Sequence, residues 1–455
     1  MSSSSKASER ITSLLDENSF VEVGQLVTAR ATNFNLTPAQ TPSDGVVTGY
    51  GTIGGNLVFV YSQDSSVLGG SIGEMHAKKI TSLYDLAVKT GAPIIGLLDS
   101  AGLRLQEGTD ALNAFGTIYA KQAQASGVIP QITAVFGNCG GGLALVAGMS
   151  DFAFMADSAS LFVNSPNALA GNKNTDTSKS SYKAANGSVD LVAAEDEVLA
   201  KIRELVDILP SNNEDEAVAE CSDDLNRACD AIAANPEDAA AAVKDLADGY
   251  SFFETKKDFA KDMITGFARF NGQTAGVVAN ADRKITTAGA QKAARFVKFC
   301  DAFEIPVVTY TNVDGFAATE AEEKTIATAA ASLANAFAET TSPKVNVIVN
   351  AIGSAYAVMN SKALGADITI ALPDAEIGIL DGRFASQVIA GDKDADTQAR
   401  AAAEFNEMNT SASAAARGYV DQIAEPADVR KYVIGALEML YTKREEVLSR
   451  KHGTV

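Results

Sequence analysis

The sequence predicts an α/β protein made of two copies of one structural unit, with strands and helices in the same order in each half. The first observation is a pair of similar segments, VVTGYGTIGGNLVFVYSQD (46–64) and MITGFARFNGQTAGVVAN (263–280). Each contains two β-rich runs around a Gly-Gly or Asn-Gly turn, which is typical of a β-hairpin. The second observation is that the same succession of elements follows each hairpin.

The elements that follow the hairpins occur in pairs, one member in each half. They are a helix (75–91 and 290–303), a strand after a proline (92–100 and 305–315), a strand that turns into a helix (128–148 and 342–360) and a closing strand (151–163 and 367–380). This repeat predicts two α/β domains, which we place at residues 1–245 and 246–455. Repeated strand–helix units with buried strands favour a spiral of ββα units over a Rossmann sheet, although the pattern alone is compatible with both.

Composition excludes several classes of function. The net charge of -20 argues against binding to nucleic acid or to an anionic membrane surface, because both need basic patches. The four cysteines form no CxxC pair, so we expect reduced thiols, no metal site and a cytoplasmic protein. The first 20 residues lack the apolar stretch of a signal peptide, and we find no run of ~18 apolar residues that would span a membrane. Only two histidines are present, His76 and His452, which favours chemistry by backbone donors.

Glycine-rich turns are the first candidates for chemistry. In GNCGGGLALVAG (137–148), three glycines lie between a strand and an apolar helix. Such a turn can present backbone N–H groups to a negatively charged oxygen, as the enolate of a thioester requires. The alternative is a tight turn that only needs small residues. AIGSAYAVM (351–359) occupies the equivalent place in the second half, which favours the functional interpretation.

A polar loop after a buried strand is the second candidate. LLDSAGLRLQEG (97–108) carries Ser100, Arg104, Gln106 and Glu107. Arg104 could bind a phosphate or carboxylate, or Glu107 could neutralise it within a solvated loop. We interpret His76, on the helix after GGSIG, as a hydrogen-bonded core or surface histidine.

Together these motifs resemble the biotin-dependent carboxyltransferases, the family of acyl-CoA carboxylase β subunits and of decarboxylase α subunits. The resemblance covers nearly the whole chain. It is carried by RITSLLDENSFVEV (10–23), DGVVTGYGTIGGNLVFVYSQDSSVLGGSIGEMHAKKI (44–80), TGAPIIGLLDSAGLRLQEG (90–108), ASGVIPQITAVFGNCGGG (125–142), LPSNNED (209–215), FFETKKDFAKDMITGFARFNGQTAGVVAN (252–280), KAARFVKFCDAFEIPVVT (292–309) and PDAEIGIL (373–380). It implies two crotonase-like domains, the first on the acyl-CoA side and the second on the biotin side.

The resemblance also implies a reaction, with its cofactor and partners. A carboxyl group moves, in either direction, between biotin on a separate carrier protein and a short-chain acyl-CoA. A biotin carboxylase or a membrane decarboxylase subunit is the further partner. The site is expected between the first domain of one subunit and the second domain of another, in a homo-oligomer such as a dimer or hexamer. No metal is implied.

The resemblance assigns roles to particular residues of the two turns and of the loop. Gly141 and Gly142 match the pair suited to the thioester carbonyl, and Ser354 and Ala355 match the pair that faces biotin. The implied substrate-binding positions are Ser100, Ala101, Gly102, Arg104, Gln106, Tyr356 and Ala357.

The chain departs from the family pattern at several positions. Ser354 stands where glycine is usual, Ala357 where aspartate is common, and Ala101 and Leu103 where glycine and alanine are usual. The segments 168–190 and 322–337 replace stretches that shape the family's cleft. Two alternatives therefore stay open: a non-catalytic structural paralogue in a carboxylase complex, and a biotin-independent crotonase-type enzyme such as a hydratase, which would need paired carboxylates.

Overall fold

The computed structural model describes residues 5–30, 34 and 37–445. The chain divides into two compact units, Met1–Ala217 (unit 1) and Val218–Val455 (unit 2). The sequence placed this division at 245/246. The difference is residues 218–245, which include most of helix α8 (Ala239–Leu246), whose apolar face belongs to the same buried core as strands of unit 2. The last residues of the proposed first domain therefore pack with the second unit.

Unit 1 is built on a mixed sheet in the order β1-β2-β3-β4-β5-β6-β8, with β7 paired to β5 beside this path. From β3 onward neighbouring strands are parallel, and helices connect them. The strands are β1 (Val21–Glu22), β2 (Val46–Ile53), β3 (Asn56–Gln63), β4 (Ile94–Ser100), β5 (Gln131–Gly140), β6 (Phe152–Ala156), β7 (Ser160–Phe162) and β8 (Leu191–Ala193). The helices are α1 (Lys6–Leu14), α2 (Glu74–Thr90), α3 (Thr109–Ala125), α4 (Leu143–Met149), α5 (Ser180–Ala185) and α6 (Glu195–Ile208).

Unit 2 repeats this arrangement with a sheet in the order β17-β16-β15-β13-β11-β10-β9 and a separate pair, β12-β14. Its strands are β9 (Phe252–Thr255), β10 (Met263–Phe270), β11 (Gln273–Asn280), β12 (Lys284–Ile285), β13 (Val307–Val313), β14 (Gly315–Phe316), β15 (Lys344–Ile352), β16 (Ile368–Gly378) and β17 (Gln422–Ile423). Its helices, besides α8, are α7 (Asp230–Ala234), α9 (Thr287–Ala302), α10 (Glu320–Glu323), α11 (Ile326–Glu339), α12 (Gly353–Val358), α13 (Gly382–Ala390), α14 (Ala395–Met408), α15 (Ser411–Ala416) and α16 (Val429–Leu440).

The predicted repeat is confirmed strand by strand. The two hairpins are β2–β3 and β10–β11, and their turns place Gly54, Gly55, Asn271 and Gly272 at positive φ, as two-residue hairpin turns require. In each unit one long strand makes its pairing on this side in two successive parts with shifted registers. The first half of β5 pairs with β6 and its end with β7, while β15 pairs with the start and then the end of β16. The register of each sheet therefore shifts at this point, close to the turn that begins the following helix.

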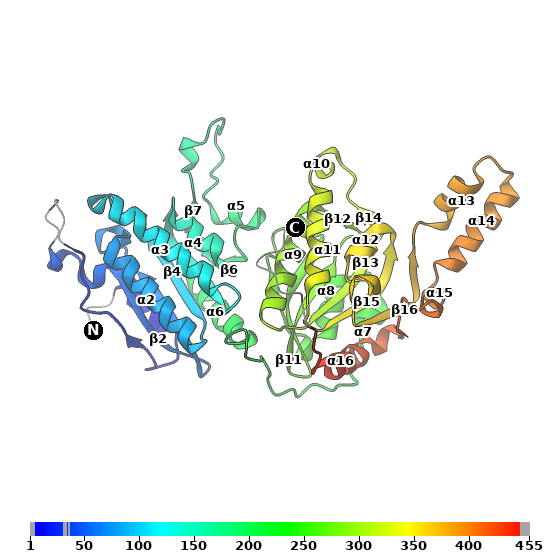
Figure 1. Cartoon of the computed structure of the whole chain (residues 1–455), viewed down its shortest axis with the longest axis horizontal. Helices are drawn as coiled ribbons and strands as arrows, with labels where there is room; N and C mark the ends of the chain where they lie inside the picture. Colours follow the sequence, from blue (N-terminus) through cyan, green and yellow to red (C-terminus); the bar gives the residue numbers. More distant parts are fainter. Residues whose placement is uncertain (1–4, 31–33, 35–36, 446–455) are drawn as a thin grey trace. The chain divides into compact units, whose positions relative to one another are not determined.

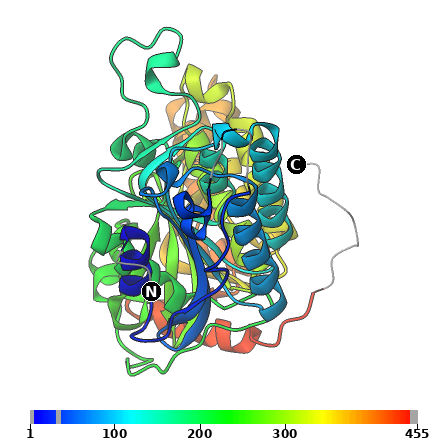
Figure 2. The ribbon, with the colours of Figure 1, turned by 90° about the vertical axis from the view of Figure 1, so that its left-hand side faces the viewer.

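Helices cover both faces of the unit 1 sheet because its parallel strands are apolar on both sides. Figure 2 shows α1, in dark blue, and α2, in lighter blue, on opposite faces of this sheet. Helices α2 and α3 pack against one another, and α9 and α11 do so in unit 2. Helix α2 ends at Gly91, whose left-handed conformation (φ +62°) closes the helix.

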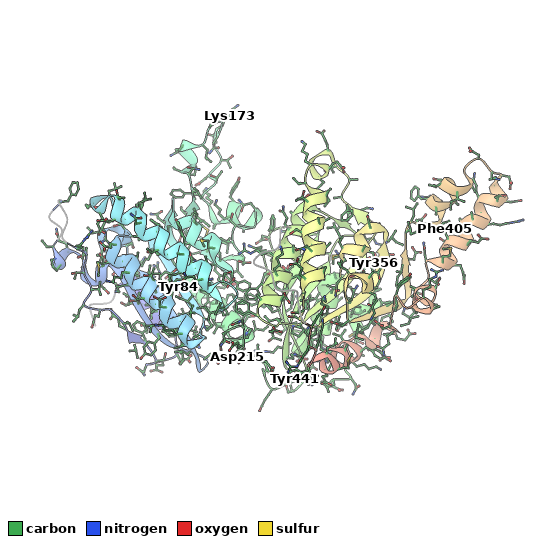
Figure 3. The ribbon with its side chains drawn as sticks, viewed as in Figure 1. Tyr84, Lys173, Asp215, Tyr356, Phe405 and Tyr441 are labelled. Atoms are coloured by element: carbon green, nitrogen blue, oxygen red, sulfur yellow. The ribbon has the colours of Figure 1, made fainter. Side chains whose placement is uncertain are left out.

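The segments 168–190 and 193–247, which lie between the two sets of repeated elements, differ in structure. The polar segment 168–190 forms the projecting loop whose tip carries Lys173 in Figure 3, and then the short helix α5. The segment 193–247 contains α6, α7 and α8, and residues 209–229 between α6 and α7 form no helix.

An arm made of α13 and α14 extends from the end of β16 in unit 2 (Figure 1). The two helices pack on each other, and α14 has no fully buried residue. Apolar side chains of α13 stay exposed, among them Val388 at 80% and Ile389 at 64%.

Candidate active site

The first turn (residues 140–143) connects β5 to α4. Gly141 has φ +62°, a conformation that L side chains rarely adopt, and this lets the chain reverse direction at the end of the strand. The next residue, Gly142, returns to helical geometry. Successive N–H groups in such a left-handed, right-handed succession form a concavity that binds anions. The predicted turn chemistry thus has a structural basis.

The donors of the first turn are not all available. The Gly141 N–H donates to the carbonyl of Phe162 on β7 at 2.9 Å. No described residue accepts a hydrogen bond from the N–H groups of Gly142 or Leu143. The resemblance assigned Gly141 and Gly142 as the donor pair. In the structure the adjacent unpartnered donors are Gly142 and Leu143, because the Gly141 N–H already donates to Phe162 on β7.

The second turn (residues 352–355) occupies the equivalent place between β15 and α12. Gly353 has φ +75° and takes the role of Gly141. No described group accepts from the N–H of Ser354 or Ala355. The Ala355 side chain is buried against the sheet, whereas Ser354 is exposed. The Ser354 hydroxyl therefore faces the outside of the unit and leaves its own N–H free.

A buried amide holds α12 on the sheet behind the second turn. Asn346 on β15 donates to the carbonyls of Met359 and Asn360 at 3.2 and 2.8 Å, at the end of α12. Its oxygen accepts from the hydroxyls of Thr309 and Thr311 at 2.9 and 2.7 Å. Because every polar atom of this amide is paired, the helix position is fixed relative to the strands.

The loop after β4 lies partly beside the first turn. A Cβ built on Gly102 would lie 3.5 Å from the Gly140 carbonyl oxygen, so these two backbones are close. The buried Ser100 hydroxyl accepts from the Gly102 N–H at 3.1 Å, and the Ala101 N–H donates to Gly69 at 2.8 Å. Ala101 and Gln106 are exposed. Of the expected substrate-binding residues in this loop, Gly102 borders the first turn.

Arg104 is not placed for a ligand. Its side chain is fully buried, with its guanidinium 2.5 Å from Asp44 Oδ1 and 2.9 Å from Glu107 Oε1. It also donates to the Ser71 carbonyl at 2.6 Å. The expectation that Arg104 binds a substrate phosphate or carboxylate is therefore not met, because internal carboxylates neutralise it. The alternative of an internal ion pair holds, but in the interior and not in a solvated loop.

His76 is part of the same buried cluster. Its Nδ1 donates to the Asp44 carbonyl at 2.9 Å and its Nε2 accepts from Gln63 at 3.2 Å. Burial, with the nearby Arg104 charge, lowers the pKa of His76 to about 3. Burial also lowers the pKa of Lys79 to about 8, although its ammonium donates to the Ser43 carbonyl at 3.0 Å. His76 is a structural histidine, as interpreted; His452 lies outside the described residues.

The cysteines and the remaining expected site residues, Tyr356 and Ala357, complete the description of the two turns. All four cysteines are free and three are buried, and burial raises the pKa of Cys139, beside the first turn, to about 12. The described part of the chain contains no cluster of His, Cys, Asp or Glu side chains that would bind a metal, and no helix there is long and apolar enough to cross a membrane. Tyr356 on α12, labelled in Figure 3, is half-buried, and Ala357 is exposed.

Each of the two related units carries a strand-to-helix turn with unpartnered backbone N–H groups, an arrangement with which enzymes can stabilise negatively charged oxygens. The chain belongs to the carboxyl transferase domain family, whose pattern matches residues 3–455. It is therefore a carboxyltransferase, as the sequence motifs predicted.

Relatives and solved structures agree with this assignment. A propionyl-CoA carboxylase beta chain of Roseobacter denitrificans is 40% identical over 481 residues, which cover 99% of this chain and 93% of that protein. A methylmalonyl-CoA decarboxylase subunit alpha of Veillonella parvula is 39% identical over 472 residues, covering 99% and 92%. The structure of transcarboxylase 12S with hydrolysed methylmalonyl-CoA bound superposes with a TM-score of 0.94 at 34% identity, covering 98% of this chain and 92% of that one. The predicted two-domain crotonase-like fold is confirmed.

Proposed function

We propose that this chain is the carboxyltransferase subunit that moves a carboxyl group between biotin on a separate carrier protein and a short-chain acyl-CoA. It would act as a component of a carboxylase or of a decarboxylase. The observation that carries the proposal is the pair of equivalent turns with unpartnered N–H groups, one in each unit. One reaction with two charged oxygens needs two such sites. The four free cysteines suit a cytoplasmic enzyme.

In this proposal unit 1 binds the thioester. When the bond between the α-carbon and its carboxyl group breaks, the electron pair moves onto the thioester oxygen. The N–H groups of Gly142 and Leu143 would stabilise that negative charge, and their positions are set before the reaction. Gly102, which borders this turn, and its neighbour Ala101 would contact the thioester arm. Carboxylation is the same path in reverse.

Unit 2 would bind biotin at the second turn. Two adjacent free N–H groups, of Ser354 and Ala355, fit a single acceptor such as the ureido oxygen. Biotin supplies the nitrogen that carries the carboxyl group. Tyr356 and Ala357, which follow on α12, are the proposed neighbours of the ligand. Serine in place of glycine at 354 preserves the donor that this role needs.

A hydratase mechanism is not favoured by the structure. Such chemistry needs paired carboxylates, and both oxygens of Glu107, the carboxylate of the candidate loop, are occupied inside unit 1. They accept from Arg104 at 2.9 Å and from the Glu74 N–H at 2.6 Å. A buried carboxylate held in this way cannot add water to a thioester. The non-catalytic paralogue remains an outcome of the test below.

The test is decarboxylation of malonyl-, methylmalonyl- and glutaconyl-CoA by the full chain, with free biotin at high concentration as acceptor. We expect biotin-dependent loss of the carboxyl group from one of these thioesters, measured by chromatography of the CoA products. Folded protein that binds CoA but turns over none of the three would favour the non-catalytic alternative. Turnover that ignores biotin would contradict the proposed cofactor.

A substitution at the second turn tests the role of its donors. Ser354→Pro removes one N–H in the first turn of α12, where proline is tolerated. We expect kcat of the biotin-dependent reaction to fall by about 10²- to 10³-fold, the usual cost of losing one oxyanion donor. Ser354→Ala keeps the N–H and should stay within a few-fold of wild type. Equal rates for the two variants would refute the assignment.

A further inference from the structure

Helix α3 holds the first turn from behind through a tyrosine that the sequence motifs did not single out. The Tyr119 hydroxyl donates to the carbonyl of Gly142 at 2.6 Å. One helical turn further along, the Gln122 amide donates to the Val146 carbonyl at 2.9 Å. These two hydrogen bonds tie α3 to α4 at both ends of one turn of the helix. Tyr119 is the member of this pair that contacts the proposed site.

The contact fixes a particular peptide group. The peptide that contains the Gly142 carbonyl also contains the Leu143 N–H, and a planar trans peptide directs these two groups in opposite directions. The Gly142 carbonyl also accepts from the Leu145 N–H at 3.2 Å, within the start of α4. When Tyr119 holds the carbonyl toward α3, the Leu143 N–H must therefore point away from α3.

The fit around Gly142 is close. A Cβ built on Gly142 would lie 2.8 Å from the Tyr119 hydroxyl oxygen, nearer than side chains normally approach. Its φ of -60° is ordinary, so glycine is required by this contact and not by the backbone conformation. The Tyr119 ring packs beside Phe115, with the ring centroids 5.9 Å apart, and is therefore held independently of its hydroxyl.

We infer that Tyr119 is a positioning residue for the carboxyltransferase reaction: its hydroxyl orients the Gly142–Leu143 peptide so that Leu143 donates to the thioester oxyanion. A hydrogen bond to the carbonyl also polarises the peptide and strengthens the N–H as a donor. The inference deepens the proposed function and depends on it for the identity of the oxyanion. It assigns to unit 1 a donor, Leu143, and a supporting residue, Tyr119, that both lie outside the segments on which the family resemblance was based.

The experiment replaces Tyr119 with phenylalanine, which keeps the ring and removes the hydrogen bond. Tyr310→Phe is the matched control, because its hydroxyl likewise donates to a backbone carbonyl, that of Pro236 at 2.7 Å, which belongs to neither turn. In the thioester decarboxylation assay we expect Tyr119→Phe to lower kcat by about 10- to 100-fold with KM changed less than about threefold. Tyr310→Phe should leave both constants near wild type. Equal kcat values for Tyr119→Phe and wild type would overturn the inference.

A crystal structure of the Tyr119→Phe variant gives a second readout that does not need turnover. We expect the Gly142–Leu143 peptide to rotate or to occupy two orientations, while α3 and α4 keep their places. An unchanged, single orientation would contradict the positioning role even if kcat fell. If the wild-type enzyme turns over no thioester, the proposed function fails, and this structure still decides whether Tyr119 orients the turn.

Discussion

At the scale of single residues, the buried charged side chains have a structural role, and the proposed chemistry uses other groups. The cluster of the charged Asp44, Arg104 and Glu107 with the neutral His76 is buried inside unit 1, although the sequence pattern gave Arg104 and Glu107 as candidates for function. The proposed chemistry falls to backbone N–H groups instead. This explains how an enzyme with two histidines can manage enolate chemistry, since backbone donors do not titrate in the working range.

The neutral state of His76 leads to a pH prediction. Its pKa is lowered to about 3 in the folded protein and is about 6.5 when unfolded, so below pH 6.5 the unfolded state binds a proton that the folded state does not. The stability that His76 contributes is present above pH 6.5 and is lost progressively as pH falls toward 3. Between pH 7 and 5.5 we expect this loss to be about 1 kcal/mol. Urea unfolding at the two pH values measures it.

His76→Gln is the control for this prediction, because glutamine has no proton to gain in this range. The variant is expected to be less stable at both pH values, but its free energy of unfolding should fall by about 1 kcal/mol less than that of wild type. If both proteins lose the same amount, His76 is not held neutral in the fold.

At the scale of elements, the repeat extends to the way that helices begin. The carboxylate of Glu107 accepts from the Glu74 N–H at the start of α2, at 2.6 Å. In unit 2 the carboxylate of Glu322 accepts from the Thr287 N–H at the start of α9, also at 2.6 Å. Both carboxylates come from the segment after the strand that follows the helix. Each carboxylate accepts from an otherwise unpartnered N–H group, and its negative charge interacts favourably with the positive end of the helix dipole.

The two caps differ in their surroundings, and this predicts unequal costs. Glu107→Gln leaves the buried Arg104 with one carboxylate, Asp44, so we expect the free energy of unfolding to fall by about 3–5 kcal/mol. Glu322 is half-exposed and has no such buried partner, so Glu322→Gln should cost about 1 kcal/mol or less. Thermal unfolding of the two variants compares them. A larger loss from Glu322→Gln would show that helix capping outweighs the buried ion pair.

The elements also show what a sequence can and cannot predict. The hairpins, the helices after them and the glycine turns were predicted because turn residues and apolar spacing act over a few positions. The hydrogen-bond partners of the candidate residues were not predicted. The Gly141 N–H donates to the Phe162 carbonyl, and Arg104 donates to the Asp44 carboxylate. The Gly142 carbonyl accepts from the Tyr119 hydroxyl. Each of these contacts joins residues about 20 or more positions apart, and local pattern carries no signal for them.

At the scale of the whole molecule, the arm of α13 and α14 is the feature that a single chain does not explain. Ile379 is 82% exposed, and Phe384, Val388 and Ile389 on α13 are at least half-exposed. Figure 3 shows Phe405 on α14, the helix that pairs with α13. Exposed apolar side chains on so small a helix pair are typical of an interaction surface. The solved transcarboxylase 12S structure is described as a hexamer.

We therefore predict that this arm contributes to a homo-oligomer, as the family resemblance implies. Sedimentation of wild-type protein should give a mass that is a multiple of 47.3 kDa. The double substitution Val388→Glu and Ile389→Glu should shift this mass toward smaller species, because burying two carboxylates in an apolar contact is costly. Met439→Glu, at a side chain of α16 that is 60% exposed, is the control and should leave the assembly intact. A wild-type mass for the double variant, with unchanged circular dichroism, would place the contact between subunits elsewhere on the chain.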